Sequence, residues 1–468
     1  MSATDPRFKP YLLPGVIAVV ALLALVFWVT RGSGPLSVRV PGTDRGPENE
    51  LGTNANAVLA GKLVKGDGLP ANLPGAWPQF RGPERDGIGH ETIPLLRDFA
   101  PGSPRQLWAI DVGEGYAGPA IFNGRVYLMD YDRDQKQDAL RCLSLEDGRE
   151  IWRFAYPVAI KRNHGMSRTV PAVQDPFVVA IGPKCHVVCV DAASGELKWG
   201  MDLVREHGTT IPPWYAGQCP LIEGDRVLLA PGGPEALLLA ANLKTGEVLW
   251  KTPNPRAWKM THSSIMAMEF EGQRMYVYCG HNGVAGVSAS TGELLWDTTE
   301  WKISIATVPT PIILSGGRIF LSGGYDAGSL MLQLKKEEGR FKTETVYRLD
   351  AKTFGATQQT PILYNDRIYG VRPDNKFACL TPEGKILWTS PAGQHFGLGA
   401  FLLADNVIFG VNDSGLLRLF EASPEQYKLL GEAKVLDGRE AWGPMALAGG
   451  RLLVRDLTRM VCLDVTRK

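Results

Sequence analysis

The sequence predicts an all-β protein, an eight-bladed β-propeller of four-stranded antiparallel blades preceded by one N-terminal transmembrane helix. Three observations predict it. A Gly-x-x-x-Trp signature recurs at nearly constant spacing, each repeat carries four short strand-like runs, and one long uncharged apolar segment lies near the start of the chain. Repeats of roughly 40 to 50 residues with four strands each are typical of propeller blades.

The apolar segment covers residues 11–30, YLLPGVIAVVALLALVFWVT, without a charged side chain. Twenty residues at a helical rise of about 1.5 Å span about 30 Å, the thickness of the hydrocarbon core. A cleaved secretory signal would need a small-residue cleavage site, whereas Trp28, Val29 and Thr30 follow the apolar core. After a short tail at residues 1–10 we therefore expect a single-pass anchor in the cytoplasmic (inner) membrane, with the larger part on the extracytoplasmic, periplasmic side.

Residues 31–76 carry Gly, Pro, Asn and isolated charges without hydrophobic periodicity, so we expect a flexible linker there and the propeller over residues 77–468. The signature recurs in this second region at Trp-to-Trp steps of 47, 51 and 46 residues, followed by a gap of 92. Its five copies are Gly148–Trp152, Gly195–Trp199, Gly246–Trp250, Gly292–Trp296 and Gly384–Trp388.

Aligning the repeats predicts where each innermost strand starts. The eight positions are Pro119, Pro171, Pro220, Ile265, Pro311, Pro361, Ala400 and Pro444. The fifth and seventh repeats lack the Gly-Trp ending, and the eighth ends before a fourth strand. Residues 105–112 have the missing outer-strand pattern, so we expect them to complete the last blade and close the ring, which removes open sheet edges.

The recurring tryptophans are expected to be structural. A glycine supplies the positive φ of the hairpin before the outer strand, and the following indole suits the wedge between neighbouring blades, where its N–H can meet a carbonyl. The docking set is Trp108, Trp152, Trp199, Trp250, Trp296 and Trp388.

Composition excludes some classes of function. The chain has 50 Lys and Arg against 49 Asp and Glu, so no global field attracts nucleic acid, and no nucleic-acid partner is expected. Its seven cysteines lie mostly in short apolar runs, and we interpret them as small buried hydrophobic residues rather than as disulfides. The histidines show no metal-ligand spacing, so no metal site is expected.

The run Val190-Asp-Ala-Ala-Ser-Gly-Glu-Leu-Lys-Trp199 resembles the tryptophan-docking repeat of the PQQ-like propeller superfamily. Quinoprotein alcohol dehydrogenases and the outer-membrane assembly lipoprotein BamB belong to that superfamily. The opening Trp77-Pro-Gln-Phe-Arg-Gly-Pro83 is similar to the start of many bacterial PQQ-like-repeat proteins. The dehydrogenases carry an adjacent Cys pair over the quinone, and no two cysteines are adjacent here. The resemblance therefore implies a BamB-like, non-enzymatic branch with no cofactor.

In a propeller, the loops before the innermost strands converge on one mouth of the central channel. Large or polar residues recur there, and a concave pocket ringed by them is one expectation; a hydrated rim is the other. The candidate ligand-binding residues are Tyr116, Arg168, Gln218, His262, Gln358, His395 and Trp442. Lys161, Arg162 and His164 cluster in one loop and form a candidate anion-binding site, with a solvated inter-blade loop as the alternative.

The sequence thus favours a membrane-anchored extracytoplasmic propeller that binds a protein or polymer partner without catalysis. The alternative is a PQQ-dependent quinoprotein dehydrogenase with degenerate ligands for PQQ and Ca²⁺. A sensor for a polysaccharide or small ligand shares the features of the first hypothesis.

Overall fold

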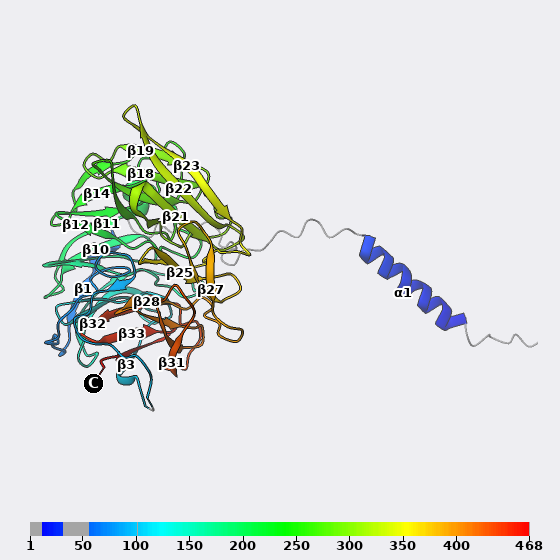
Figure 1. Cartoon of the computed structure of the whole chain (residues 1–468), viewed down its shortest axis with the longest axis horizontal. Helices are drawn as coiled ribbons and strands as arrows, with labels where there is room; N and C mark the ends of the chain where they lie inside the picture. Colours follow the sequence, from blue (N-terminus) through cyan, green and yellow to red (C-terminus); the bar gives the residue numbers. More distant parts are fainter. Residues whose placement is uncertain (1–11, 31–55, 101, 468) are drawn as a thin grey trace, which may run out of the picture. The chain divides into compact units, whose positions relative to one another are not determined.

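The chain divides into two units, which are described separately. In the first unit, residues 1–46, helix α1 spans Leu12–Thr30. Across the residues placed in the structure, no helix is both long and apolar enough to cross a membrane, so the anchor predicted at residues 11–30 is not confirmed. The computed structural model describes residues 12–30, 56–100 and 102–467 (Figure 1).

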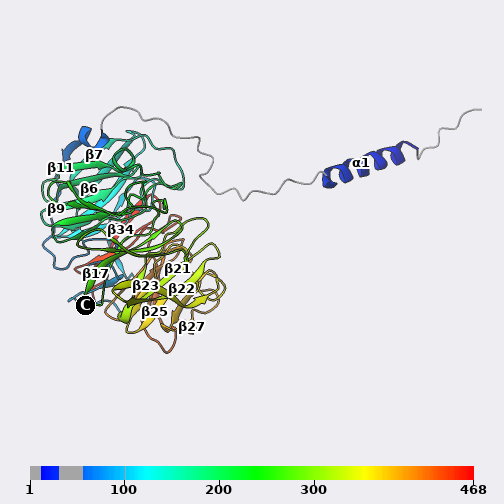
Figure 2. The same cartoon turned by 90° about the horizontal axis from the view of Figure 1, so that it is seen from above.

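The second unit is a ring of eight sheets, here called blades 1 to 8. Figure 2 shows blades 1 and 2 on the opposite side of the domain from blades 5 and 6, as an eight-membered ring requires. The all-β, eight-bladed fold predicted from the sequence is confirmed. Each innermost strand begins one or two residues after the position predicted for it, and at six of the eight positions a proline ends the preceding loop.

From the axis outward, blade 1 consists of β4 (Ala120–Phe122), β5 (Arg125–Asp132), β6 (Gln137–Ser144) and β7 (Glu150–Pro157), and blade 2 of β8 (Ala172–Gln174), β9 (Phe177–Ile181), β10 (His186–Asp191) and β11 (Leu197–Asp202). Blade 3 consists of β12 (Leu221–Glu223), β13 (Arg226–Leu229), β14 (Leu239–Asn242) and β15 (Val248–Lys251). Blade 4 consists of β16 (Met266–Phe270), β17 (Gln273–Gly280), β18 (Gly283–Ser288) and β19 (Leu294–Thr298). A short helix, α2 (Leu203–His207), follows β11.

In the same order, blade 5 consists of β20 (Ile312–Ile313), β21 (Arg318–Gly323), β22 (Gly328–Glu337) and β23 (Arg340–Leu349), with a 3-10 turn, η2 (Ser315–Gly317), between β20 and β21. Blade 6 consists of β24 (Ile362–Tyr364), β25 (Arg367–Val371), β26 (Phe377–Leu380) and β27 (Ile386–Thr389). Blade 7 consists of β28 (Phe401–Ala404), β29 (Val407–Val411), β30 (Leu416–Glu421) and β31 (Leu429–Lys434), and blade 8 of β32 (Ala446–Ala448), β33 (Arg451–Arg455), β34 (Arg459–Asp464) and β3 (Arg105–Asp111).

Blade 8 closes the ring with strands from both ends of the propeller. Strand β3 pairs antiparallel with β34, and Trp108 lies opposite Cys462. In Figure 1 the cyan β3 accordingly lies beside the red strands of the chain's C-terminal part. Because the outer strand comes from the N-terminal side, neither end of the ring leaves an unpaired blade edge.

The docking tryptophans join each blade to the next. The Trp199 N–H donates to the Leu243 carbonyl of blade 3 at 2.9 Å. Its ring lies against Gly246, where φ is +75° and an added Cβ would lie 2.7 Å from the indole. Glycine is therefore required there by both backbone conformation and space. The same contact pairs Trp108 with Gly148, Trp152 with Gly195 and Trp250 with Gly292.

Blade 5 departs from this pattern because its outer hairpin lacks the signature. Trp296 faces that blade and directs its N–H to the sulfur of Met275 in its own blade, at 3.3 Å. In blade 5 the docking ring is Tyr347, whose hydroxyl donates to the Pro382 carbonyl at 2.8 Å and whose ring lies against Gly384. Trp388 of blade 6 docks normally and donates to the Ser423 carbonyl of blade 7 at 2.8 Å.

All seven cysteines are buried and free, as the sequence predicts. Four of them share one position, directly across from a docking ring and next to a β-bulge. A small apolar side chain there leaves room for the indole, and burial raises the pKa of these thiols. The four pairs are Cys142 with Trp152, Cys189 with Trp199, Cys379 with Trp388, and Cys462 with Trp108.

The flexible linker predicted over residues 31–76 is wrong from residue 56 onward. Here the chain forms a 3-10 turn, η1 (Ala57–Ala60), and then β1 (Lys62–Lys65), which pairs with β7 as a fifth strand of blade 1. Val58 is fully buried against Gly200 of blade 2. A four-residue strand is too short to show a hydrophobic period, so no pattern in the sequence indicates it. The part at residues 31–55 lies outside the described residues.

Candidate functional site: the channel mouth

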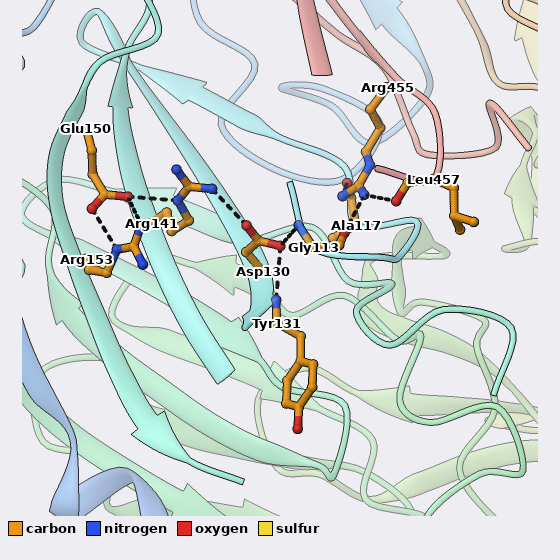
Figure 3. Close-up of polar contacts among 9 residues, drawn as sticks. All are labelled: Gly113, Ala117, Asp130, Tyr131, Arg141, Glu150, Arg153, Arg455 and Leu457. Atoms are coloured by element: carbon orange, nitrogen blue, oxygen red, sulfur yellow. Dashed lines mark hydrogen bonds and ion pairs between the residues drawn. The ribbon is translucent and has the colours of Figure 1, made fainter. Parts of the chain in front are cut away.

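The mouth is formed by the segments that precede the innermost strands, and the segment before β4 is held from two sides. The Gly113 N–H donates to Asp130 Oδ1 at 2.7 Å, and Arg455 donates to the carbonyls of Gly113 at 3.0 Å and Ala117 at 3.2 Å (Figure 3). Arg455 is 1% exposed, and burial lowers the pKa of its guanidinium to about 10. These contacts fix the position of Tyr116, which lies between the two carbonyls.

Asp130 is itself held by a row of charges across blade 1. Arg141 bonds both Asp130 and Glu150 at 2.8 Å, and Arg153 bonds Glu150 at 2.6 Å (Figure 3). Burial alone would raise the pKa of Glu150, but hydrogen bonds from the two arginines outweigh it and the pKa is lowered. The network therefore keeps this carboxylate charged and Arg141 aligned toward Asp130.

Three of the predicted mouth residues come together. The Tyr116 ring stacks on Trp442 with 5.2 Å between centroids, and the Arg168 guanidinium lies 5.4 Å from the Tyr116 ring. The Tyr116 hydroxyl donates to Glu440, and Trp442 Nε1 donates to Asp413 Oδ1 at 2.7 Å. Burial and then the Glu440 hydrogen bond raise the pKa of Tyr116, which stays protonated. We call Tyr116, Trp442 and Arg168 the mouth platform.

Gln218 and His262 have different roles. Gln218 is fully buried and bonds the backbone N–H and carbonyl of Ala230 at 2.8 and 3.0 Å, so its amide is used inside blade 3. His262 Nε2 bonds the Tyr215 carbonyl at 2.9 Å. Burial, followed by the charge of Arg168, lowers the pKa of His262 to about 4, so its ring is neutral at pH 7. His395 is exposed in the loop before β28.

The three predicted anion-binding residues are all exposed, and one of them, Arg162, is paired with a carboxylate. Arg162 forms an ion pair with Glu114 at 2.6 Å, and that hydrogen bond raises its pKa. Arg168 donates to loop carbonyls, among them Met166 at 3.2 Å and Asn163 at 3.2 Å. Lys161 contributes its carbonyl to Tyr215, and His164 adopts a positive φ of 48°. Arg162 and Arg168 thus make contacts that hold this loop, and anion binding there stays a prediction.

Residues 77–89 cross the channel, a feature the sequence did not predict. Trp77 exchanges backbone hydrogen bonds with Ile121 of blade 1 at 2.8 Å. The Pro78 carbonyl accepts the N–H of Val173 in blade 2, and at the other end β2 (Ile88–Gly89) pairs with β28 of blade 7. We call this segment the plug, because it links blade 2 through Pro78 to the opposite blade 6, where Arg81 donates to the Thr360 carbonyl.

Beneath the platform the plug leaves a small half-open pocket of about 80 Å³. Trp442 contributes to both the platform and the pocket, so the two form one site. Gln358, the remaining predicted mouth residue, also lines the pocket. The other walls come from the plug and from blades 6 to 8, with Trp77, Phe80, Arg81, Phe401 and Pro444 among them.

The plug brings two arginines into the channel. Arg85 is 3% exposed, and its Nη1 donates to Gln79 Oε1 at 3.2 Å and to the Pro220 carbonyl at 3.0 Å. Arg81 is half-buried and lines the pocket. Burial lowers the pKa of both guanidinium groups to about 10. In the sequence, Arg81 and Arg85 stand in Arg-Gly and Arg-Asp-Gly runs of the opening motif. These glycines indicate tight turns, but nothing in the runs indicates that the arginines lie in the channel.

Plug side chains line the pocket at the axis, and all seven cysteines are buried and free, with no two adjacent in the sequence. Among the residues with described positions, no group of three or more His, Cys, Asp or Glu side chains could hold a metal ion.

Comparison with known proteins agrees with this architecture. Structures similar in fold are BamB from Moraxella catarrhalis (12% identity, TM-score 0.53, covering 77% of this chain and 99% of that one) and a europium-containing methanol dehydrogenase (12% identity, TM-score 0.55, covering 82% and 89%). No match was found among curated proteins. A family model described as outer membrane protein assembly factor BamB matches residues 135–390, more than half of the chain. The chain therefore belongs to this PQQ-like β-propeller family.

Proposed function

We propose that this chain is a binding module that holds a protein or polymer partner at the channel mouth. The plug is the observation that carries the proposal, because it crosses the channel and the pocket that it lines measures about 80 Å³. Pockets that enclose small organic ligands typically measure about 300–1,000 Å³. A partner that contacts the mouth surface is therefore favoured over an enclosed cofactor.

The mouth platform supports this function. Tyr and Trp rings bury large areas at small entropic cost, and with Arg they are enriched in binding hot spots. Tyr116 and Trp442 already have their polar atoms bonded to Glu440 and Asp413, so the ring faces are fixed before a partner arrives. A pre-ordered platform loses little entropy on association.

The matched family suggests the class of partner. Its description names an assembly factor for outer membrane proteins. On that analogy, which is one of fold and family only, we propose a protein partner ahead of a polysaccharide.

Attachment to the cytoplasmic membrane through residues 11–30, with the propeller on the periplasmic side, is part of the proposal. Its support is the uncharged twenty-residue apolar segment. Carbonate extraction of cell membranes tests it: the full chain should stay in the pellet, and Leu23→Arg with Val20→Arg should release it. Release of the unmodified chain would contradict the anchor.

Site-specific photocrosslinking in cells tests the binding function. A photoreactive residue at His395, exposed beside the mouth, should yield a discrete adduct that Trp442→Ala removes. The matched control is the same residue at Lys244, which is exposed in the hairpin between β14 and β15, on the opposite face of the ring. Equal adducts at both positions, or none at either, would contradict a mouth surface.

The dehydrogenase alternative is tested on the purified full chain. Added PQQ and Ca²⁺ should produce no dye reduction with alcohols or sugars. Reduction that saturates at micromolar PQQ would overturn the proposal.

A further inference from the structure

The arginines of the plug form no ion pair among the described residues, although the charge of Asp86 partly opposes the effect of burial on the pKa of Arg81. Neither Arg81 nor Arg85 forms an ion pair with any carboxylate in the described parts of the chain, whereas Arg141, Arg153 and Arg162 all do. A buried cation without a counter-charge is costly, so such groups generally acquire a partner.

Counting donors locates the free position on Arg81. A guanidinium has five N–H groups. Four hydrogen bonds are made: Nε to the Arg85 carbonyl, Nη1 to Thr360, and Nη2 to Asp86 and Pro361, all at 2.7 to 3.0 Å. One N–H of Nη1 remains, on a side chain that lines the pocket.

Gln358 supplies a second donor. Its side chain lines the same pocket and makes no hydrogen bond to other described residues, although it is half-buried. By contrast, the neighbouring Gln359 donates to the carbonyls of Gly397 and Gly399 at 2.8 and 3.0 Å. Of these two adjacent amides, one serves the fold and the other is left facing the pocket.

We propose that this pocket binds a carboxylate group, with Arg81 and Gln358 as its donors. The inference deepens the proposed function and rests on it for the idea that the carboxylate belongs to a bound partner. Among the described residues that line the pocket, Arg81 alone is charged, so a monoanion matches it. Aromatic walls from Trp77, Phe80 and Trp442 suit the carbon attached to a carboxylate and disfavour a doubly charged phosphate.

Calorimetric titration of the purified full chain with acetate, propionate and inorganic phosphate tests the site. Acetate and propionate should bind. Gln358→Glu places a carboxylate beside Arg81 and should weaken acetate binding at least tenfold, since like charges repel in a poorly solvated site. The same variant should raise the unfolding temperature at low salt, because it supplies the missing counter-charge. Gln135→Glu, on the exposed hairpin between β5 and β6, is the matched control and should leave acetate affinity unchanged.

A pair of short peptides separates the two sources of carboxylate. A peptide with a free C-terminal carboxylate that binds tenfold tighter than its C-terminal amide assigns the group to a protein partner; acetate binding without this preference assigns it to a small acid. Either result supports the pocket. Equal acetate affinity in the wild type and in Gln358→Glu, or binding of phosphate alone, overturns it. Because the titration needs no partner, failure of the crosslinking experiment would leave its result intact.

Discussion

Asp138→Asn should make this protein more stable above neutral pH. Asp138 on β6 is fully buried and accepts a hydrogen bond from the Tyr156 hydroxyl at 2.5 Å, while its Oδ1 has no partner among the described residues. Gly182 of blade 2 covers the pair so closely that a Cβ would lie 2.1 Å from the carboxyl. Burial, only partly opposed by Tyr156, raises the pKa of Asp138 from 3.8 to about 7.

The sign of the effect follows from the raised pKa. Below pH of about 4 the carboxyl is protonated in both states. As the pH rises to about 7, the unfolded chain ionises while the folded one keeps its proton, so the free energy of unfolding falls. At about 1.4 kcal/mol per pH unit this amounts to about 4 kcal/mol. Burial also lowers the pKa of His186, whose ring lies 5.7 Å from that of Tyr156, so no nearby histidine charge offsets the loss.

The amide in Asp138→Asn stays neutral, so the free energy of unfolding of the variant should not fall with pH in this way. At pH 8 the free energy of unfolding of the variant should be higher by about 4 kcal/mol, because no ionised carboxylate is buried. An amide N–H left unpaired at the position of Oδ1 should reduce this gain by about 1–3 kcal/mol. Urea unfolding followed by tryptophan fluorescence at pH 5, 6, 7 and 8 measures the difference, with Asp134→Asn in an exposed turn as control. A difference between wild type and variant that is constant over this range would refute the reasoning.

Three further outcomes are expected from urea unfolding. Gly246→Ala should lower the free energy of unfolding by well over 1 kcal/mol, on the order of the backbone strain at positive φ plus a clash with Trp199. Gly224→Ala has the same positive φ but open space around it, so it should lower the free energy of unfolding by the strain alone, about 1 kcal/mol. Tyr347→Phe keeps the docking ring but loses one hydrogen bond across blades, about 1 kcal/mol; no change would mean that the bond is replaced by water. Arg455→Met should cost about 2–4 kcal/mol and also lower crosslinking at the mouth, since the clamped segment is released; unchanged crosslinking would remove its positioning role.

The blades could be predicted because they repeat a local chemistry. The Gly-x-x-x-Trp signature, as in Gly195–Trp199, marks a hairpin and an outer strand wherever it recurs. Its internal spacing is the same in each copy, although the surrounding sequence differs. The substitute ring Tyr347 could not be predicted in this way. It occupies the position of a docking tryptophan, opposite Met331 at the bulge, but without the glycine pattern in its own hairpin nothing in the sequence distinguishes it.

The site was only partly predictable because it depends on contacts across the ring. Tyr116 and Trp442 were found by their place before innermost strands, although they are more than three hundred residues apart. Their partners Glu440 and Asp413 were not, since a single carboxylate in a loop has no pattern. The cations at residues 161–168 were visible as a cluster, but the partner of Arg162, Glu114, lies in a distant segment of the chain and could not be recognised.

The position just before each innermost strand explains why the pocket lies on one side of the channel. From blade 2 to blade 6, a backbone N–H at this position donates to the side chain at the same position of the next blade: Val170 to Cys219 at 3.2 Å, Cys219 to Ser264 at 3.0 Å, Ser264 to Thr310 at 3.3 Å, and Thr310 to Thr360 at 2.9 Å. A thiol or hydroxyl at each step thus ties five blades together around the axis.

This series of hydrogen bonds ends at Thr360, because the next three blades carry Gly399, Gly443 and Gly118 at this position. A glycine has no side chain that could accept the bond. At Gly399 none could be added, since a Cβ would lie 1.8 Å from the carbonyl of Val411. Thr360 is also a wall of the pocket. Where side chains cannot bridge the blades, the plug does so instead, pairing with blade 7 through β2 and with blade 1 through Trp77. Arg81 therefore enters the channel on the side where the ring cannot supply its own bridging groups, and the pocket forms between the plug and blades 6 to 8.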